Sequence, residues 1–176
     1  GLISIKIEED DELVDVKHVP KTQDSVFINA QNGKMIRFDL TDVRETGRNT
    51  KGVNGIKLDD NNSVVAIATA DSTTETDTTI LSVTEQGFGK QTTLDTYREQ
   101  SRYGKGSYDI NTGNRNGAVI GTESVVGTKT LLLGTKNGKV LRTTTDEIAT
   151  VGKNAKGVGI VKLNDGDSVC SITTCD

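Results

Sequence analysis

The sequence predicts an all-β fold, a propeller-like array of about three four-stranded blades preceded by part of another blade. Three observations support this prediction. One sequence pattern recurs three times within the 176 residues. Each copy alternates short apolar runs with glycine-containing turns. The chain has nineteen Gly, one Pro, three Phe, three Tyr and no Trp, a composition typical of aliphatic strands joined by tight turns.

The repeat is clearest around a turn glycine and a later Lys-Gly pair. The turn glycine precedes the lysine by 18 residues in every copy. These pairs are Gly33 with Lys51, Gly87 with Lys105, and Gly138 with Lys156. Successive copies are offset by 54 and 51 residues. A unit of this length is typical of a blade, and blades stack because one blade alone cannot cover its own apolar faces.

The start of the chain is a half copy of the same repeat. The opening GLISIKI resembles GVNGIKL from Gly52 and GVGIVKL from Gly157. We therefore expect the chain to begin inside a repeat unit and to be a fragment of a longer array. The predicted segments are the end of a preceding blade at residues 1–20 and three blades at residues 21–76, 77–126 and 127–176. Together they form one domain fragment.

Each unit is expected to contain four strands in a fixed order. An apolar strand leads into the glycine turn at residues 25–30, 79–83 and 130–134. A strand with basic side chains follows at residues 34–38, 88–92 and 139–143. After a polar connection and the Lys-Gly turn, a third strand ends at Leu58, Ile110 or Leu163. An acidic turn precedes the last apolar strand at residues 64–68, 118–120 and 169–172. A parallel β-helix or an all-β sandwich is the alternative architecture.

Several classes of function lack the residues that they need. No apolar run approaches the roughly 20 residues of a membrane-spanning helix, and no signal peptide opens the chain, so we expect a soluble, cytoplasmic protein. His18 is the only histidine, and with Cys170 and Cys175 it supplies too few ligands for a zinc site. No nucleophile, general base or metal cluster is visible. We therefore expect no catalytic residue, no metal and no cofactor in this chain.

Charge is distributed in phase with the repeat. The net charge of −4 and the pI near 5.1 argue by themselves against a nucleic-acid-binding protein. Residues 33–57 nonetheless carry six Lys or Arg against three acids, residues 87–106 four against two, and residues 138–162 five against two. If the units superpose, these cations form a basic rim along one edge of the array. Such a line of cations suits a phosphate backbone.

Cations at equivalent positions of the copies are the candidate DNA-contacting residues. Arg37 aligns with Arg142, and Lys51 aligns with Lys105 and Lys156. The full set is Lys34, Arg37, Arg48, Lys51, Lys90, Arg102, Lys105, Lys139, Arg142, Lys153 and Lys156. Ion pairing with neighbouring surface acids is the competing role for these side chains.

The motifs of this repeat resemble those of a known family. The pattern NGK-x-x-R followed by GRNTKGVNGIKL, with GFGKQT in the middle copy, resembles the C-terminal domain of the DNA gyrase A subunit. It resembles the corresponding domain of topoisomerase IV less closely. The resemblance covers the whole chain and implies a β-pinwheel, a propeller-like ring whose basic outer rim binds and bends duplex DNA. It also implies a role in negative supercoiling in the nucleoid, in partnership with the gyrase B subunit, together with the rest of the gyrase A subunit.

The stretch QSRYGKG at residues 100–106 resembles the family's QRRGGKG box but lacks one Arg and one Gly. That box belongs to the first blade of the family. The order of repeats here resembles the last three of the family's six blades, which makes QSRYGKG the equivalent loop of the fifth. Tyr103 within it either stacks on a sugar or base of DNA or packs on its own blade.

A second class of function stays open at this point. A protein-interaction propeller would carry its binding site on the central face or the blade tops, and its rim cations would only keep the array soluble. Binding to duplex DNA that weakens steeply with salt favours the first class, and an absence of binding at low salt favours the second.

Overall fold

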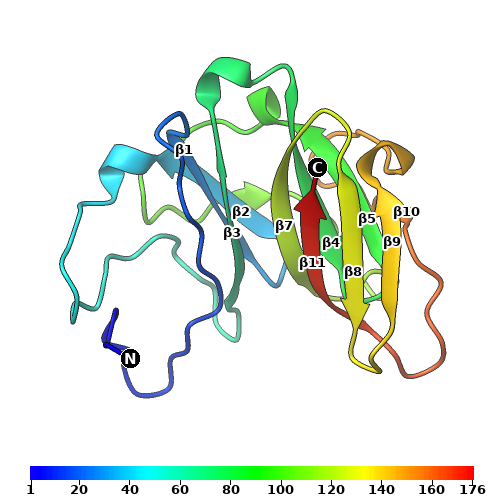
Figure 1. Ribbon diagram of the computed structural model, residues 1–176, viewed down its shortest axis with the longest axis horizontal. Coiled ribbons are helices and arrows are strands. Elements are labelled where there is room, and N and C mark those ends of the chain that lie inside the picture. The colour runs from blue at the N-terminus through cyan, green and yellow to red at the C-terminus, as the bar shows by residue number, and fades with distance from the viewer.

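The computed structural model describes residues 1–176 as an all-β molecule (Figure 1). It contains eleven strands and four short 3-10 turns, and no α-helix. The predicted all-β class is confirmed. No helix in the structure has the length and apolar character needed to cross a membrane.

Three antiparallel sheets follow one another along the chain. The first contains β1 (Ser25–Ala30), β2 (Lys34–Asp39) and β3 (Val64–Ala70). The second contains β4 (Thr78–Thr84), β5 (Phe88–Thr93) and β7 (Val119–Val126). The third contains β8 (Thr130–Thr135), β9 (Val140–Thr144) and β11 (Val169–Cys175). In every sheet the first strand lies between the second and the last.

Two short strands join neighbouring units. Strand β6 (Ser107–Tyr108) pairs with β2 of the first sheet, and β10 (Val158–Gly159) pairs with β5 of the second. The prediction that each such strand belongs to its own unit is therefore wrong. No strand forms in the equivalent stretch before Leu58, because no second strand of another sheet lies beside it.

The recurring Lys-Gly pairs explain how these short strands approach their neighbours. Gly106 has a φ of +68°, and a Cβ built on it would lie 2.5 Å from the Met35 carbonyl oxygen. Gly157 has a φ of +71°, and its Cβ would lie 2.3 Å from the Gly89 carbonyl oxygen. Only glycine combines the left-handed backbone with this approach. The repeat keeps its glycine at these positions because one unit crosses onto the preceding sheet there.

A 3-10 turn follows the second strand of each unit. These turns are η1 (Leu40–Asp42), η3 (Leu94–Thr96) and η4 (Thr145–Glu147), and η2 (Ser72–Thr74) joins the first unit to the second. In each of the three equivalent turns the backbone N–H of the C-terminal capping residue donates to the carbonyl of the first residue. The turn therefore has the same shape in every unit.

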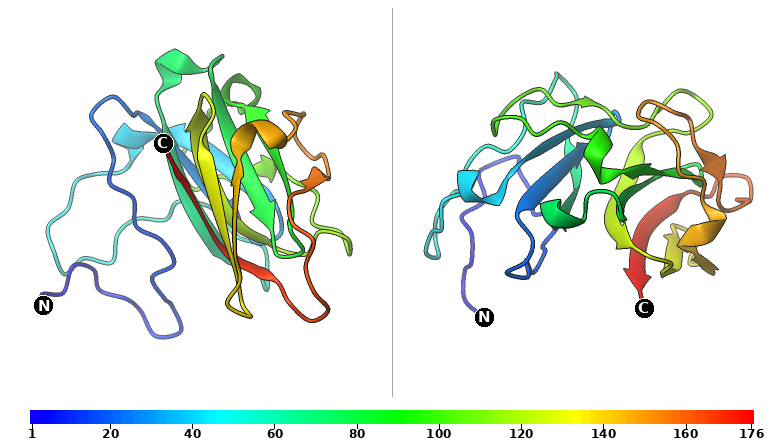
Figure 2. Two further views of the ribbon diagram at one scale, coloured as in Figure 1. Left: turned by 45° about the vertical axis from the view of Figure 1, so that its right-hand side comes forward. Right: turned by 90° about the horizontal axis from the view of Figure 1, so that it is seen from above.

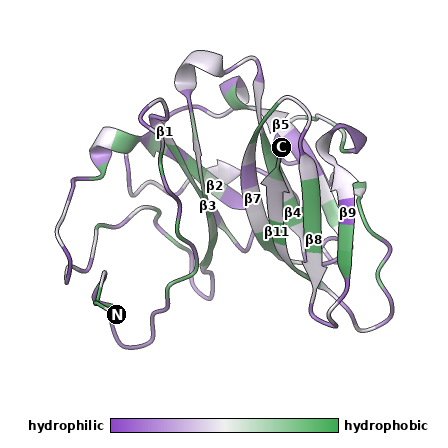
Figure 3. Ribbon diagram, in the orientation of Figure 1, coloured by the Kyte–Doolittle hydropathy of each residue, from purple (hydrophilic) through white to green (hydrophobic).

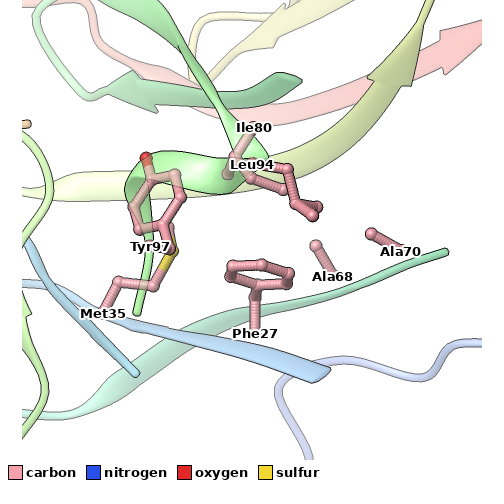
Figure 4. Packing of buried hydrophobic residues seen from close by; sticks show 7 residues of the cluster. All are labelled: Phe27, Met35, Ala68, Ala70, Ile80, Leu94 and Tyr97. Atoms are coloured by element: carbon pink, nitrogen blue, oxygen red, sulfur yellow. The ribbon is translucent and has the colours of Figure 1, made fainter. Parts of the chain in front are cut away.

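The hydrophobic core lies between the sheets. One cluster joins the first two units, and Figure 4 shows its seven side chains. They are Phe27, Met35, Ala68, Ala70, Ile80, Leu94 and Tyr97. The rings of Phe27 and Tyr97 meet edge to face, with centroids 5.6 Å apart. A second cluster joins units two and three around Leu81, Leu131 and Ile148. The units are thus held together by burial of apolar surface between blades.

The sheets lie side by side in an arc (Figures 1 and 2). Strand β7 packs against both β3 and β11, so the last strands of the three units are neighbours. Seen from above in Figure 2, both termini point to one side of the molecule, and the green and orange connections that follow β5 and β9 run along the other. Figure 3 shows green, hydrophobic colour concentrated on the strands and purple along the connections.

Candidate nucleic-acid interface

Three connections carry paired cations, and we call residues 47–53, 101–107 and 152–158 the basic connections. Each contains two left-handed residues at equivalent positions. Their φ angles are 68° and 76° at Asn49 and Gly52, 68° and 68° at Tyr103 and Gly106, and 61° and 71° at Asn154 and Gly157. A cation directly precedes each of these residues: Arg48 and Lys51, Arg102 and Lys105, and Lys153 and Lys156. The backbone therefore repeats the placement of two cations in every unit.

The predicted cations differ in how far solvent reaches them. The exposed ones are Arg48, Lys51, Lys105, Lys139, Arg142 and Lys156. The half-buried ones are Lys34, Arg102 and Lys153. The buried ones are Arg37 and Lys90. The expectation that all eleven lie on an exposed rim is therefore wrong for Arg37 and Lys90.

Arg37 joins the first sheet to the second unit. The residue is 6% exposed. Its Nη1 donates to the carbonyl oxygens of Leu94 (3.3 Å) and Tyr97 (3.1 Å), and its Nη2 donates to Glu75 Oε1 at 2.5 Å. The guanidinium is thus occupied by the 3-10 turn η3 and by one carboxylate. The charge stabilises the contact between units and is not presented to a ligand.

Lys90 is fully buried in a polar cluster of the second unit. Its Nζ donates to Asp109 Oδ1 (2.8 Å) and to Thr92 Oγ1 (2.5 Å). The Tyr97 hydroxyl also donates to Asp109 Oδ1, and the Ser82 hydroxyl donates to Oδ2 at 2.5 Å. Burial lowers the pKa of Lys90, and the nearby Asp109 carboxylate opposes that shift. This ammonium is satisfied inside the molecule.

The half-buried cations are held by neighbouring groups. Lys34 Nζ lies 2.6 Å from Asp59 Oδ2, and this hydrogen bond raises the pKa of Lys34 and lowers that of Asp59. Arg102 donates from Nε to the carbonyl oxygen of Asp42 at 2.9 Å and from Nη1 to that of Asn54. Lys153 Nζ lies 5.9 Å from the centroid of the Tyr97 ring. These contacts fix the side chains while leaving part of each at the surface.

Among the exposed cations, Lys51 has an acidic partner within the chain. Its Nζ pairs with Glu8 Oε1 in the N-terminal segment, and this contact lowers the pKa of Glu8. Lys105, Lys139 and Lys156 form no ion pair. Lys105 and Lys156 stand directly before a left-handed glycine, as Lys51 does. Because these two lysines have no acidic partner, a ligand could contact them without displacing a carboxylate.

Arg115 is a further cation at this surface, and the repeat did not indicate it. Its guanidinium carbon lies 4.2 Å from the centroid of the Phe88 ring, and Nη2 donates to the carbonyl oxygens of Lys156 (2.9 Å) and Gly157 (3.1 Å). It thereby fastens the third basic connection to the second unit. The equivalent positions carry Asn61 and Gly166, so comparison of the copies gives no signal for a cation there.

The whole chain matches one protein family. The family model described as "DNA gyrase C-terminal domain, beta-propeller" matches residues 1–20, 24–71, 78–125 and 129–176. The chain belongs to the DNA gyrase C-terminal domain family. The blade-like architecture and the resemblance to gyrase A stated from the sequence are thereby confirmed.

Relatives of this gyrase domain agree with the assignment. The chain is 43% identical over 174 residues to the DNA gyrase A subunit of Haloquadratum walsbyi, covering 99% of this chain and 20% of that protein. It is 38% identical to the DNA gyrase A subunit of Lawsonia intracellularis, covering all of this chain and 21% of that protein. The chain thus spans about a fifth of the length of these relatives.

Solved structures share the fold of this gyrase domain. A structure of the DNA gyrase A C-terminal domain superposes with a TM-score of 0.88 and 28% identity, covering 99% of this chain and 58% of that one. The C-terminal domain of DNA topoisomerase IV superposes with a TM-score of 0.86 at 21% identity, covering 97% of this chain and 52% of that one. The second likeness concerns the fold alone.

Proposed function

We propose that this chain binds duplex DNA along its basic connections and bends it, as a wrapping module of a gyrase-type topoisomerase. The observation that carries the proposal is the repeated backbone of those connections. Three copies of one conformation place two cations each at equivalent points of successive blades. A curved array that presents charges at regular steps suits the phosphates of a bent duplex, whose bending energy such contacts offset.

The buried cations support this function indirectly. Arg37 joins neighbouring units, and the Lys90–Asp109 pair ties β5 to a segment whose Asp109 N–H donates to the Gly33 carbonyl oxygen of the first unit; neither cation reaches the surface. They keep the spacing between basic connections fixed when the duplex resists bending. Binding that depends on phosphates and on curvature has little preference for sequence.

The parent protein supplies the remaining activity under this proposal. The gyrase B subunit, together with the rest of the gyrase A subunit, would cleave the DNA and use ATP, and this module would present a wrapped segment to them to support negative supercoiling in the nucleoid. The connection 101–107, which contains most of the variant box QSRYGKG, contributes to affinity as a later-blade equivalent. The box that dominates wrapping would lie in another blade.

The test is titration of the 176-residue chain with duplex DNA of unrelated sequences over a range of salt concentrations. We expect the logarithm of the binding constant to fall linearly with the logarithm of salt concentration, with similar slopes for each duplex. Circularisation of short duplexes in the presence of the chain measures bending. No binding to any duplex at low salt would contradict the proposal and favour a protein-interaction module.

A further inference from the structure

Two tyrosines give the middle unit a surface that the other units lack. Tyr103 and Tyr108 are 48% and 52% exposed. The positions equivalent to Tyr103 carry Asn49 and Asn154, and those equivalent to Tyr108 carry Asn54 and Gly159. Both exposed aromatic residues of the chain therefore lie between β5 and the end of β6.

Tyr103 occupies a backbone conformation that does not suit it. Its φ is +68°, in the left-handed region where asparagine is favoured and bulky residues are uncommon. Asn49 and Asn154 have φ angles of 68° and 61° at the equivalent sites, so the conformation belongs to the repeat. The tyrosine hydroxyl makes no hydrogen bond within the chain that would offset the strain. Folding alone therefore does not account for this side chain, which makes a role at the surface the better explanation.

The backbone around Tyr103 is fixed to the first unit. The Tyr103 N–H donates to the Gly55 carbonyl oxygen (2.8 Å), and the Lys57 N–H donates to the Gly104 carbonyl oxygen (2.9 Å). Strand β6 continues this attachment through pairing with β2. The two rings are thus carried on a rigid base and lose little conformational entropy when a ligand binds.

A cation lies over one of the two rings. Lys34 Nζ lies 5.4 Å from the centroid of the Tyr108 ring. Lys105, between the two tyrosines in sequence, is exposed and close enough to the Lys34 partner Asp59 to lower the pKa of that carboxyl further. An aromatic face beside cations matches the alternation of sugars and phosphates along a DNA strand.

We propose that Tyr103 and Tyr108 form an aromatic contact site for duplex DNA, in which the rings pack against deoxyribose while Lys105 contacts a flanking phosphate. This inference rests on the DNA-binding function proposed above. It adds a contact that is not ionic and that is confined to the middle unit. The middle unit would therefore contribute more to the affinity for duplex DNA than the other two units do.

The test compares two pairs of substitutions in the 176-residue chain. Tyr103→Asn with Tyr108→Asn installs the residues that the first unit carries at both positions. We expect this double variant to bind duplex DNA about tenfold more weakly at every salt concentration. The slope of affinity against salt should stay unchanged, because no phosphate contact is lost. Tyr103→Phe with Tyr108→Phe keeps both rings and should bind as the original chain does.

Three results would overturn the inference. Unchanged affinity of the asparagine pair, in a chain that binds DNA, would show that the rings make no contact and would leave the DNA-binding proposal intact. Equal losses in the phenylalanine and asparagine pairs would assign the contact to the hydroxyls. A lower salt slope in the asparagine pair would assign the loss to displaced cations. Failure of the original chain to bind any duplex would instead refute the proposed function together with this inference.

Discussion

Arg37 and Gln91 make the same contact from equivalent positions in successive sheets. Arg37 Nη1 donates to the carbonyl oxygens of Leu94 and Tyr97, which begin and cap the 3-10 turn η3. Gln91 Nε2 donates to those of Thr145 (2.7 Å) and Ile148 (3.0 Å), which begin and cap η4. One side chain per unit thus fastens the next unit through two backbone acceptors. Arg142 is the third member of this series, and its side chain is exposed with no hydrogen bond in the chain.

The first prediction concerns this contact. Arg37→Ala should lower the free energy of unfolding by roughly 2–4 kcal/mol, because it removes a charged donor and leaves two carbonyls and Glu75 without their partner. Arg142→Ala is the matched control and should change stability by less than about 0.5 kcal/mol. Urea unfolding of both variants measures the difference. Equal effects at the two positions would contradict the role of Arg37 between units.

The buried ion pair gives the second prediction. Lys90→Leu alone should destabilise the chain by roughly 3–5 kcal/mol, because it leaves Asp109 buried without its cation. The third unit carries Leu141 and Ile160 at the equivalent positions. The double variant Lys90→Leu with Asp109→Ile should recover a large part of that loss. A double-mutant cycle in urea measures the coupling, and additive losses would refute it.

These two cases show what comparison of the copies could and could not reveal. Alignment equates Arg37 with Arg142, but only Arg37 is covered by a following unit, so one sequence position has two environments. Lys90 aligns with Ile36 and Leu141, and these apolar equivalents indicate an inward-facing position. That signal was present in the sequence. The sign is missed when a lysine is assigned to the surface because its side chain is charged.

Most strand bounds were predictable to within three residues, but the strand predicted at residues 118–120 is much shorter than β7, which extends to Val126. The exchange of short strands between units was not predictable. Strand β1 has the predicted bounds, because a mostly apolar run of six residues precedes a clear glycine turn. Strands β6 and β10 have two residues each, and their partners lie more than 60 residues away in sequence. Short pairings of this kind follow from the path of the connection and leave little periodicity in the sequence. The glycines at Gly106 and Gly157 were the only local signs of these close approaches.

The third prediction compares two glycines of the repeat. Gly106→Ala should destabilise the chain by roughly 2–3 kcal/mol, because the new Cβ would meet the Met35 carbonyl in a strained backbone. Gly52 has a similar φ of +76° but no atom within 4 Å of its Cβ position. Gly52→Ala should therefore cost only the backbone strain, about 1 kcal/mol. Thermal unfolding separates the two, and equal losses would contradict the close approach of β6 to β2.

The fourth prediction concerns pH. Burial, with the charge and hydrogen bond of Asp109 in support, raises the pKa of Tyr97 far above its usual value near 10. A raised pKa of this phenol stabilises the folded state below about pH 10 and loses that contribution as the pH rises further. Tyrosine absorbance near 295 nm should show one phenol that ionises only when the chain unfolds. Tyr97→Phe should remove that late step, and its persistence would assign the step to another tyrosine.

The last prediction concerns the second cation of each basic connection. Lys105→Ala and Lys156→Ala should each weaken duplex binding and lower the salt slope by roughly one unit, because each removes one phosphate contact. Lys51→Ala should have the smallest effect, since that ammonium already pairs with Glu8 and would have to leave this carboxylate to contact a phosphate. The double variant Lys105→Ala with Lys156→Ala should show the sum of the single changes, because the two lysines share no partner. Titrations of the four variants with duplex DNA over a range of salt concentrations measure the affinity and its salt slope.

Equal effects at all three positions would mean that Glu8 leaves Lys51 when DNA binds. Unchanged slopes in all four variants would place the duplex elsewhere on the molecule.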